Sequence, residues 1–270
     1  MTASIQEGGL AITVASATAI YGLYTGSVYL MGLPGGWMAD RLIGGQKAVW
    51  YGGIIIMCGH IVLAIPNDVT FFIGLILVVL GTGLLKPNIG ALVGQLYSSE
   101  DKRRDSGYTL YYLGINLGSV IGYTVCGYLR INMGWHWAFG AAAVGMGLGL
   151  IMYKMTLSKL EGAGAEPTVK LSPKATKISW SVIGVFLLVL TVVSYMLINN
   201  MMTFNAVVVA QKFAIFATVL FLGYFAAIFF LGNNSPDEKR QLGALFLVCI
   251  ASIFFWTGFE QAGSSLNLFG

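Results

Sequence analysis

The sequence is poor in charge, in histidine and in cysteine. Only 10% of its 270 residues are charged while 57% are hydrophobic, and the mean hydropathy is +0.78. Soluble domains carry about a quarter charged residues, so this composition excludes a water-soluble enzyme. Two histidines and three scattered cysteines supply no zinc site, catalytic triad or disulfide framework. We therefore expect no metal and no cofactor, and the net charge of +4 gives no support to nucleic-acid binding.

Apolar runs long enough to cross a bilayer recur along the whole chain. A membrane helix needs roughly 20 mostly apolar residues. Seven runs of this kind are separated by short polar breaks, and an eighth begins near Gln241. The sequence predicts an all-α, polytopic membrane protein of about eight transmembrane helices, at residues 11–34, 48–66, 69–96, 107–130, 135–156, 179–201, 212–232 and 241–270.

Lysine and arginine are concentrated in alternate breaks between these runs. Four breaks hold twelve of the fifteen basic residues, whereas the other breaks hold only Arg130 and Lys212. Basic loops remain in the cytoplasm, so this pattern predicts that the four basic breaks are cytoplasmic and that both chain ends lie on the opposite side. The twelve residues are Arg41, Lys47, Lys102, Arg103, Arg104, Lys154, Lys159, Lys170, Lys174, Lys177, Lys239 and Arg240.

Two charged residues fall inside predicted spans, Lys86 and Glu260. A charge at the centre of a membrane helix costs roughly 2.5 to 3.5 kcal/mol, so each group must face water, find a partner or become neutral. They mark either a substrate or proton path or a purely structural ion pair between helices. Pro87 follows Lys86 directly and predicts a bend that exposes backbone carbonyls near the charge.

Asn116 and several glycines also lie within predicted spans. An amide facing lipid is costly, so Asn116 is expected either to bond a neighbouring helix or to contact a substrate. Small residues four apart allow helix backbones to approach closely, and they predict tight packing. These pairs are Gly22/Gly26, Gly32/Gly36, Gly90/Gly94, Gly114/Gly118/Gly122 and Gly145/Gly149.

Four motifs occur in a fixed order along the chain. They read G-G-W-M-A-D-R-L-I-G at residues 35–44, G-T-G-L-L-K-P-N at 81–88, Y-Y-L-G-I-N-L-G-S-V at 111–120 and F-W-T-G-F-E-Q at 255–261, continuing to 269. Together they resemble the motifs of the proton-coupled oligopeptide transporters (POT) of the major facilitator superfamily. Val28-Tyr29-Leu30 is similar to a shorter segment on that family's second helix.

The resemblance implies roles for individual residues. It implies that Lys86 and Glu260 take part in proton coupling, with Lys86 also holding the carboxylate of a peptide. Substrate binding is expected to involve Tyr29, Lys86, Asn116, Trp256 and Glu260. The segment at residues 35–44 is similar to a cytoplasmic turn that gates the inner side, and its implied gating residues are Gly35, Gly36, Asp40 and Gly44.

The resemblance also implies a partial major-facilitator bundle. Residues 1–156 are expected to form family helices two to six, 157–178 a cytoplasmic linker, 179–232 an inserted helix pair, and 233–270 a cytoplasmic loop with family helix seven. No E-x-x-E-R-F-x-Y-Y-G motif of the first helix occurs in the sequence. We therefore expect a fragment that lacks the first helix and the last five, whose partners include those missing transmembrane helices.

The function that the resemblance implies is proton-coupled symport of di- and tripeptides across the bacterial inner membrane. The expected partners are small peptides, protons and the lipid bilayer, without nucleic acid, and no enzymatic activity is expected. Two alternatives stay open. One is transport of another small solute, such as nitrate or an amino acid, because a lone lysine suits many anions. The other is a non-transporting membrane remnant or scaffold.

Overall fold

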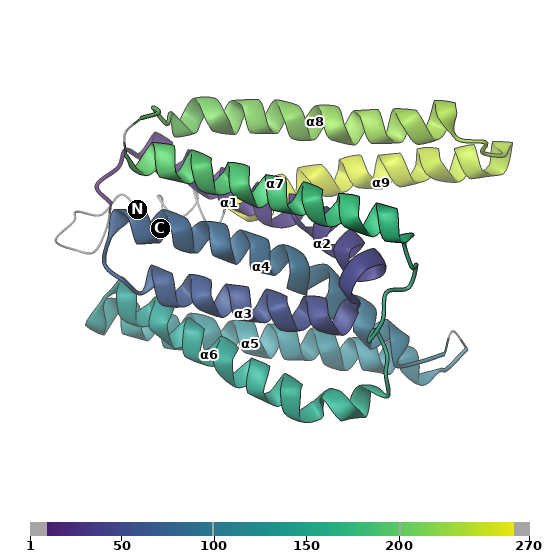
Figure 1. Ribbon diagram of the computed structural model, residues 1–270, viewed down its shortest axis with the longest axis horizontal. Helices are drawn as coiled ribbons and strands as arrows, with labels where there is room; N and C mark the ends of the chain where they lie inside the picture. The colour runs from purple at the N-terminus through teal and green to yellow at the C-terminus, as the bar shows by residue number, and fades with distance from the viewer. Residues whose placement is uncertain (1–9, 99, 200, 262–270) are drawn as a thin grey trace. The chain divides into compact units, whose positions relative to one another are not determined.

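The computed structural model describes residues 10–98, 100–199 and 201–261. Over these residues the chain is helical and contains no strand, which confirms the all-α prediction (Figure 1). In chain order the elements are α1 (Val14–Leu30), α2 (Gly32–Met38), the π-helical η2 (Ala39–Ile43), α3 (Gly45–Leu63), α4 (Asp68–Gln95), α5 (Arg103–Met133), α6 (Trp135–Thr156), the 3-10 turn η3 (Leu157–Leu160), α7 (Pro173–Ile198), α8 (Ala206–Leu231) and α9 (Pro236–Glu260).

Polar residues in the breaks define where several helices begin. In four helices the side chain of the residue before the first turn accepts a hydrogen bond from a backbone N–H of that turn. This satisfies donors that have no partner within the helix. The capping residues are Asn67 for α4, Ser172 for α7, Asn205 for α8 and Ser235 for α9.

Seven of the eight predicted spans each coincide with one helix. Their ends differ from the prediction by six residues or fewer, as where α7 begins at Pro173 rather than at residue 179, except at the end of the last span, where α9 ends at Glu260 and residues 262–270 lie outside the described residues. Six helices of the described chain, α3, α4, α6, α7, α8 and α9, are long and apolar enough to cross a membrane. Helix α1 is shorter, at 17 residues, and α5 is longer, at 31 residues, but less apolar.

The first predicted span differs from the structure. The helix is interrupted at Met31, resumes as α2 and continues through η2 to Ile43. Residues 35–43, expected to form a turn, are therefore helical, and that part of the prediction is wrong. The turn comes at Gly44, whose φ of +86° lies in a region that favours glycine.

The chain separates into two compact units by its internal contacts. The first unit contains Tyr24–Thr203, and the second contains Ile12–Leu23 together with the chain from Phe204 onward. The last residues of α1 therefore belong to the first unit and its beginning to the second. The predicted domain boundaries at residues 156, 178 and 232 stay a prediction.

In the first unit, α3 packs against α4 on one side and α6 on the other (Figure 1). Glycines bring α3 and α4 together backbone to backbone. A Cβ atom on Gly52 would lie 2.8 Å from the carbonyl oxygen of Gly81, and one on Gly74 would lie 2.9 Å from that of Gly59. Buried side chains fill the spaces along these helices: Ala48, Val49, Ile56 and Leu63 of α3, Val78 and Leu92 of α4, and Ala138, Ala143 and Leu150 of α6.

The glycines that make these contacts are mostly not the ones predicted from four-residue spacing. Gly114, Gly118 and Gly122 of α5 have no described atom within 4 Å of an added Cβ, and neither do Gly145 and Gly149 of α6. The prediction of tight packing is wrong for these five within the described chain. Spacing alone identifies a smooth stripe on a helix, whereas a contact also needs a partner backbone opposite that stripe.

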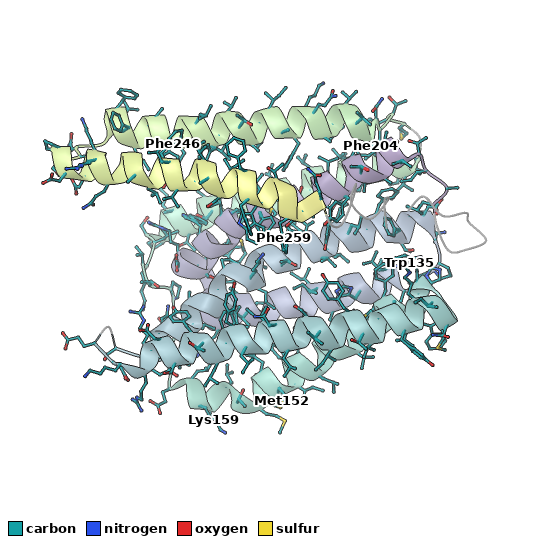
Figure 2. The ribbon with its side chains drawn as sticks, turned by 180° about the vertical axis from the view of Figure 1, so that it is seen from behind. Trp135, Met152, Lys159, Phe204, Phe246 and Phe259 are labelled. Carbon is teal, nitrogen blue, oxygen red and sulfur yellow. The ribbon has the colours of Figure 1, made fainter. Side chains whose placement is uncertain are left out.

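In the second unit, α8 and α9 form a helical hairpin held by aromatic rings. The Phe246 ring of α9 lies 5.7 Å from that of Phe221 and 5.1 Å from that of Phe225, both on α8. Figure 2 labels Phe246 at this contact. The turn between the helices ends in a capping box, in which Ser235 and Glu238 each accept a hydrogen bond from the other's backbone N–H.

An aspartate organises the beginning of α5. The Asp101 carboxylate accepts hydrogen bonds from the backbone N–H of Arg103 at 2.9 Å and from its guanidinium at 2.8 Å. These bonds, led by the guanidinium, hold the pKa of Asp101 below its ordinary value. The ionised Asp101 carboxylate therefore stabilises the folded state. This contribution is complete at a pH above the ordinary aspartate pKa, and it is lost as the pH falls through the lowered pKa of Asp101 in the folded protein.

We expect the Asp101 carboxyl to titrate below the usual aspartate range, and Arg103→Gln to raise its pKa toward that range. A carbon-13 NMR titration of labelled aspartate, assigned with Asp101→Asn, measures both values. A titration midpoint that the Arg103→Gln substitution leaves unchanged would contradict the ion-pair explanation.

Candidate functional site

Lys86, one of the two intramembrane charges, lies on α4 against an aromatic ring. Its Nζ atom is 4.2 Å from the ring centroid of Tyr29, at the end of α1. Tyr29 is 53% exposed, and Lys86 is exposed as well. A cation over an aromatic face at an exposed site gains about 0.5–1 kcal/mol, so the contact orients the lysine and leaves its ammonium accessible. The structure thus brings together two of the predicted binding residues.

The backbone next to Lys86 is shaped by Pro87. Proline has no N–H, so the carbonyl of Gly83, four residues earlier, lacks its usual helical donor. That carbonyl lies against Gly35 of α2, where an added Cβ would overlap it. Helix α4 nevertheless remains helical from Asp68 to Gln95. The freed carbonyl therefore meets a neighbouring helix within the first unit.

Asn88 joins the same two helices. It is buried, with 4% of its surface exposed, and its side-chain amide donates to the carbonyl of Gly35 at 3.2 Å and to that of Leu84 at 2.6 Å. A buried amide is stable only when it is hydrogen-bonded, so this pair of contacts fixes α2 against α4. The sequence reasoning missed this role; the signal was a polar residue directly after a proline in an apolar run.

The four predicted gating residues lie along one segment, from α2 through η2 to the start of α3. Gly35 and Gly44 are buried, Gly36 is partly buried, and Asp40 is exposed. The carbonyl of Asp40 accepts a hydrogen bond from the backbone N–H of Val169, at 3.0 Å. The segment is therefore in contact with the region predicted to be a linker.

Asn116, on α5, is not brought to Lys86 by any hydrogen bond of the described chain. Its side-chain amide donates to the carbonyl of Tyr112, one turn earlier in the same helix, at 2.8 Å, and the residue is exposed. This bond satisfies the amide without a neighbouring helix. Its predicted contact with substrate stays a prediction.

Glu260 and Trp256 lie at the end of α9, in the second unit. The Tyr21 hydroxyl of α1 donates to the Glu260 carboxylate at 3.3 Å. The Trp256 ring is 5.6 Å from that of Phe255 and 5.1 Å from that of Phe259. Sequence reasoning missed Tyr21, because nothing local in the sequence pairs it with a residue 239 positions away. The rest of the predicted motif, residues 262–269, lies outside the described residues.

The described chain contains no group of three or more histidine, cysteine, aspartate or glutamate side chains that could hold a metal. A shallow, mostly apolar depression lies along α7, and none of the predicted site residues lines it. Its lining residues are Lys177, Ile178, Ser181, Val182 and Val185.

The helices and the two charges define a multi-pass membrane protein, and comparison with known proteins specifies its family. The family model described as "POT family" matches residues 46–270. The chain belongs to this family. The family and the relatives below are transporters, and the resemblance seen in the four motifs is thereby confirmed.

Similar curated proteins include two bacterial peptide transporters. Peptide transporter YePEPT of Yersinia enterocolitica is 36% identical over 278 residues, which cover 100% of this chain and 54% of the relative. The di-/tripeptide transporter of Lactococcus lactis subsp. cremoris is 34% identical over 268 residues, covering 98% of this chain and 54% of the relative. The chain spans about half the length of the curated relatives it matches.

Solved structures agree with this assignment. A crystal structure of a peptide transporter POT in complex with sulfate matches with a TM-score of 0.89 and 36% identity, covering 98% of this chain and 54% of that one. A POT family transporter in complex with a thioalcohol-conjugated peptide matches with a TM-score of 0.91 and 29% identity. The match covers 100% of this chain and 56% of that one.

Proposed function

We propose that this chain forms part of a proton-coupled symporter of di- and tripeptides in the bacterial cytoplasmic membrane. The observation that carries the proposal is Lys86, a cation within an apolar helix of a POT family chain, held against Tyr29 with its ammonium exposed. A charge at this position is costly unless it faces water or an anion. A peptide supplies that anion in its terminal carboxylate, and relatives of this chain are peptide transporters.

Each predicted residue takes a role in this proposal. Lys86 binds the carboxylate of the peptide, and Tyr29 orients Lys86. Glu260 carries the coupled proton, and the Tyr21 hydroxyl holds its carboxylate in place by donating a hydrogen bond to it. Trp256 supplies an aromatic wall and Asn116 an amide for the peptide backbone, once a substrate or another helix replaces its bond to Tyr112.

The proposed domains follow the family architecture. Residues 1–156 form the first bundle, 157–178 the cytoplasmic linker, 179–232 the inserted helix pair, and 233–270 the start of the second bundle. Alternating access requires two bundles that rock around a midplane site. Helices beyond the present sequence therefore complete the path, and the segment with Gly35, Gly36, Asp40 and Gly44 gates its inner side.

Transport of another small solute is the second candidate, because a single exposed ammonium also binds nitrate or the carboxylate of an amino acid. Uptake into proteoliposomes separates the two. We expect the whole protein to accumulate labelled dialanine only when the vesicle interior is alkaline, and unlabelled tripeptide to compete. Free alanine and nitrate should not compete.

Competition by nitrate or alanine but not by tripeptide would favour the second candidate. Uptake at the same rate with and without a proton gradient would contradict proton coupling. An absence of uptake of all these solutes by folded, reconstituted protein would leave the non-transporting scaffold as the better explanation.

A further inference from the structure

The loop that follows α6 packs back onto the first unit. Residues 162–170, here called the docked segment, return to the end of the unit that carries the Gly44 turn. Two of its carbonyls, those of Ala163 and Gly164, accept hydrogen bonds from Gln46 at 2.8 and 2.9 Å. Farther along, the backbone N–H of Val169 donates to the carbonyl of Asp40 at 3.0 Å. The segment thus binds both sides of the turn.

Gln46 uses three of its polar groups at this junction. Its backbone N–H donates to Gly164, its side-chain amide donates to Ala163, and its carbonyl accepts the hydroxyl of Tyr153, on α6, at 3.1 Å. The backbone N–H lies in the first turn of α3, where it has no partner within the helix. The N-cap residue of α3, Gly44, has no side chain that could accept this hydrogen bond. A carbonyl of the docked segment therefore supplies the missing N-terminal cap of α3.

Close packing accompanies these bonds. A Cβ on Gly44 would lie 2.7 Å from the carbonyl oxygen of Ala165, so only glycine leaves room for the segment there. Gly164, with a φ of +66°, lies so close to Leu92 of α4 that an added Cβ would overlap the Leu92 side chain. Within the segment, Lys170 and Glu166 form an exposed ion pair at 2.9 Å. The segment thus contacts α3 and α4, and Gln46 extends the junction to α6.

We propose that Gln46 is a positioning residue that latches residues 162–170 onto the η2 helix and the Gly44 turn and thereby holds the inner gate in one conformation. The gating part of this inference rests on the proposed function. The physical basis is that rocking bundles transmit motion only if each moves as a rigid body. The η2 helix that carries Asp40 is held by the docked segment as well as by its neighbouring helices, so release of the segment loosens the gate.

A pair of glycine variants tests the latch by hydrogen exchange of the whole protein in lipid nanodiscs. Gly162 and Gly164 have φ values of +84° and +66°, so Ala strains the backbone at both. Only Gly164 is packed, since a Cβ on Gly162 meets no described atom within 4 Å. We expect Gly164→Ala to speed exchange about fivefold or more across residues 40–48, the effect of losing roughly one hydrogen bond.

The matched variant Gly162→Ala should leave exchange at residues 40–48 at the wild-type rate. Equal rates at residues 40–48 in Gly164→Ala and wild type would overturn the latch, provided that both proteins are folded. This readout does not depend on transport, so the latch is tested even if the proposed function fails.

Substitutions of Gln46 test the role of its side chain. Gln46→Glu keeps the size but removes the donor to Ala163, and a carboxylate in the first turn of α3 is favoured by the helix dipole, so the helix should persist. We expect exchange at residues 162–170 to rise about fivefold in Gln46→Glu and to return toward the wild-type rate in Gln46→Lys, which restores a donor.

Peptide uptake then tests the link to gating. In Gln46→Glu we expect the maximal rate of gradient-driven uptake to fall while the KM for dialanine stays within about twofold, because the binding residues are untouched. A changed KM with an unchanged maximal rate would contradict the gating role. Wild-type uptake kinetics in Gln46→Glu, together with faster hydrogen exchange at residues 162–170, would also contradict the gating role.

Discussion

Gly35→Ala is expected to disrupt the first unit. The Gly35 Cα faces the carbonyl of Gly83, which has no helical donor because Pro87 occupies the next turn, and any Cβ would overlap that oxygen. A carbonyl of a packed helix cannot move aside as a flexible side chain can, so α2 must separate from α4. Overpacking of this kind typically costs about 1–3 kcal/mol, and the Asn88 bond to Gly35 is strained with it.

The measurement is the midpoint of thermal unfolding in detergent, with monodispersity by size-exclusion chromatography. The adjacent Gly36 is a matched control in the same helix. A Cβ on Gly36 would lie 3.9 Å from the Cβ of Pro87, which is an ordinary contact. We therefore expect Gly36→Ala to unfold close to the wild-type temperature. Equal midpoints for the two variants would mean that the Gly35–Gly83 approach does not limit stability.

Lys86→Gln is expected to reduce gradient-driven uptake of dialanine at least tenfold. The substitution keeps a polar side chain of similar length but removes the charge, so an ammonium–carboxylate hydrogen bond becomes a neutral one. Hydrogen bonds to charged groups contribute roughly 1.5–3 kcal/mol, and each 1.4 kcal/mol is a factor of ten in affinity. Initial rates in proteoliposomes measure the loss, and Lys102→Gln, at an exposed residue outside the spans, is the control.

Variants of Tyr29 separate the effect of the ring from that of its hydroxyl. Tyr29→Phe keeps an aromatic face for the Lys86 ammonium, and Tyr29→Leu removes it. If the ring orients Lys86, the phenylalanine variant retains more uptake than the leucine variant. Equal losses of uptake in both Tyr29 variants would assign the role to the hydroxyl instead. Separately, wild-type uptake in Lys86→Gln would show that this lysine is not needed for transport.

Helix positions were well predicted because a membrane span is encoded locally. The run that became α6 was predicted at residues 135–156, the observed bounds, since an apolar stretch between polar breaks depends on no distant contact. The interruption at Met31 was not visible, because it depends on how α2 meets α4. Gly83, whose added Cβ would lie 2.6 Å from the Met31 carbonyl, sets that meeting point.

The candidate site was predictable only in part for the same reason. Lys86 and Glu260 could be identified because a charge in an apolar run is conspicuous by itself. Their neighbours Tyr29 and Tyr21 come from other helices, and only the motif resemblance indicated the first of them. Gln46 was missed because polar residues in helix breaks are common, and its contacts form only when a loop more than a hundred residues later folds back.

Helices α7 and α8 have no buried residue in their apolar stretches, and this exposure has a consequence for the membrane around them. Each has 26 residues and so measures about 39 Å at a rise of 1.5 Å per residue, longer than a hydrocarbon layer of about 30 Å. Such helices relieve hydrophobic mismatch by tilting or by thickening the surrounding lipid. Their tilt should consequently follow acyl-chain length, so a change of lipid would reorient them without any change in sequence.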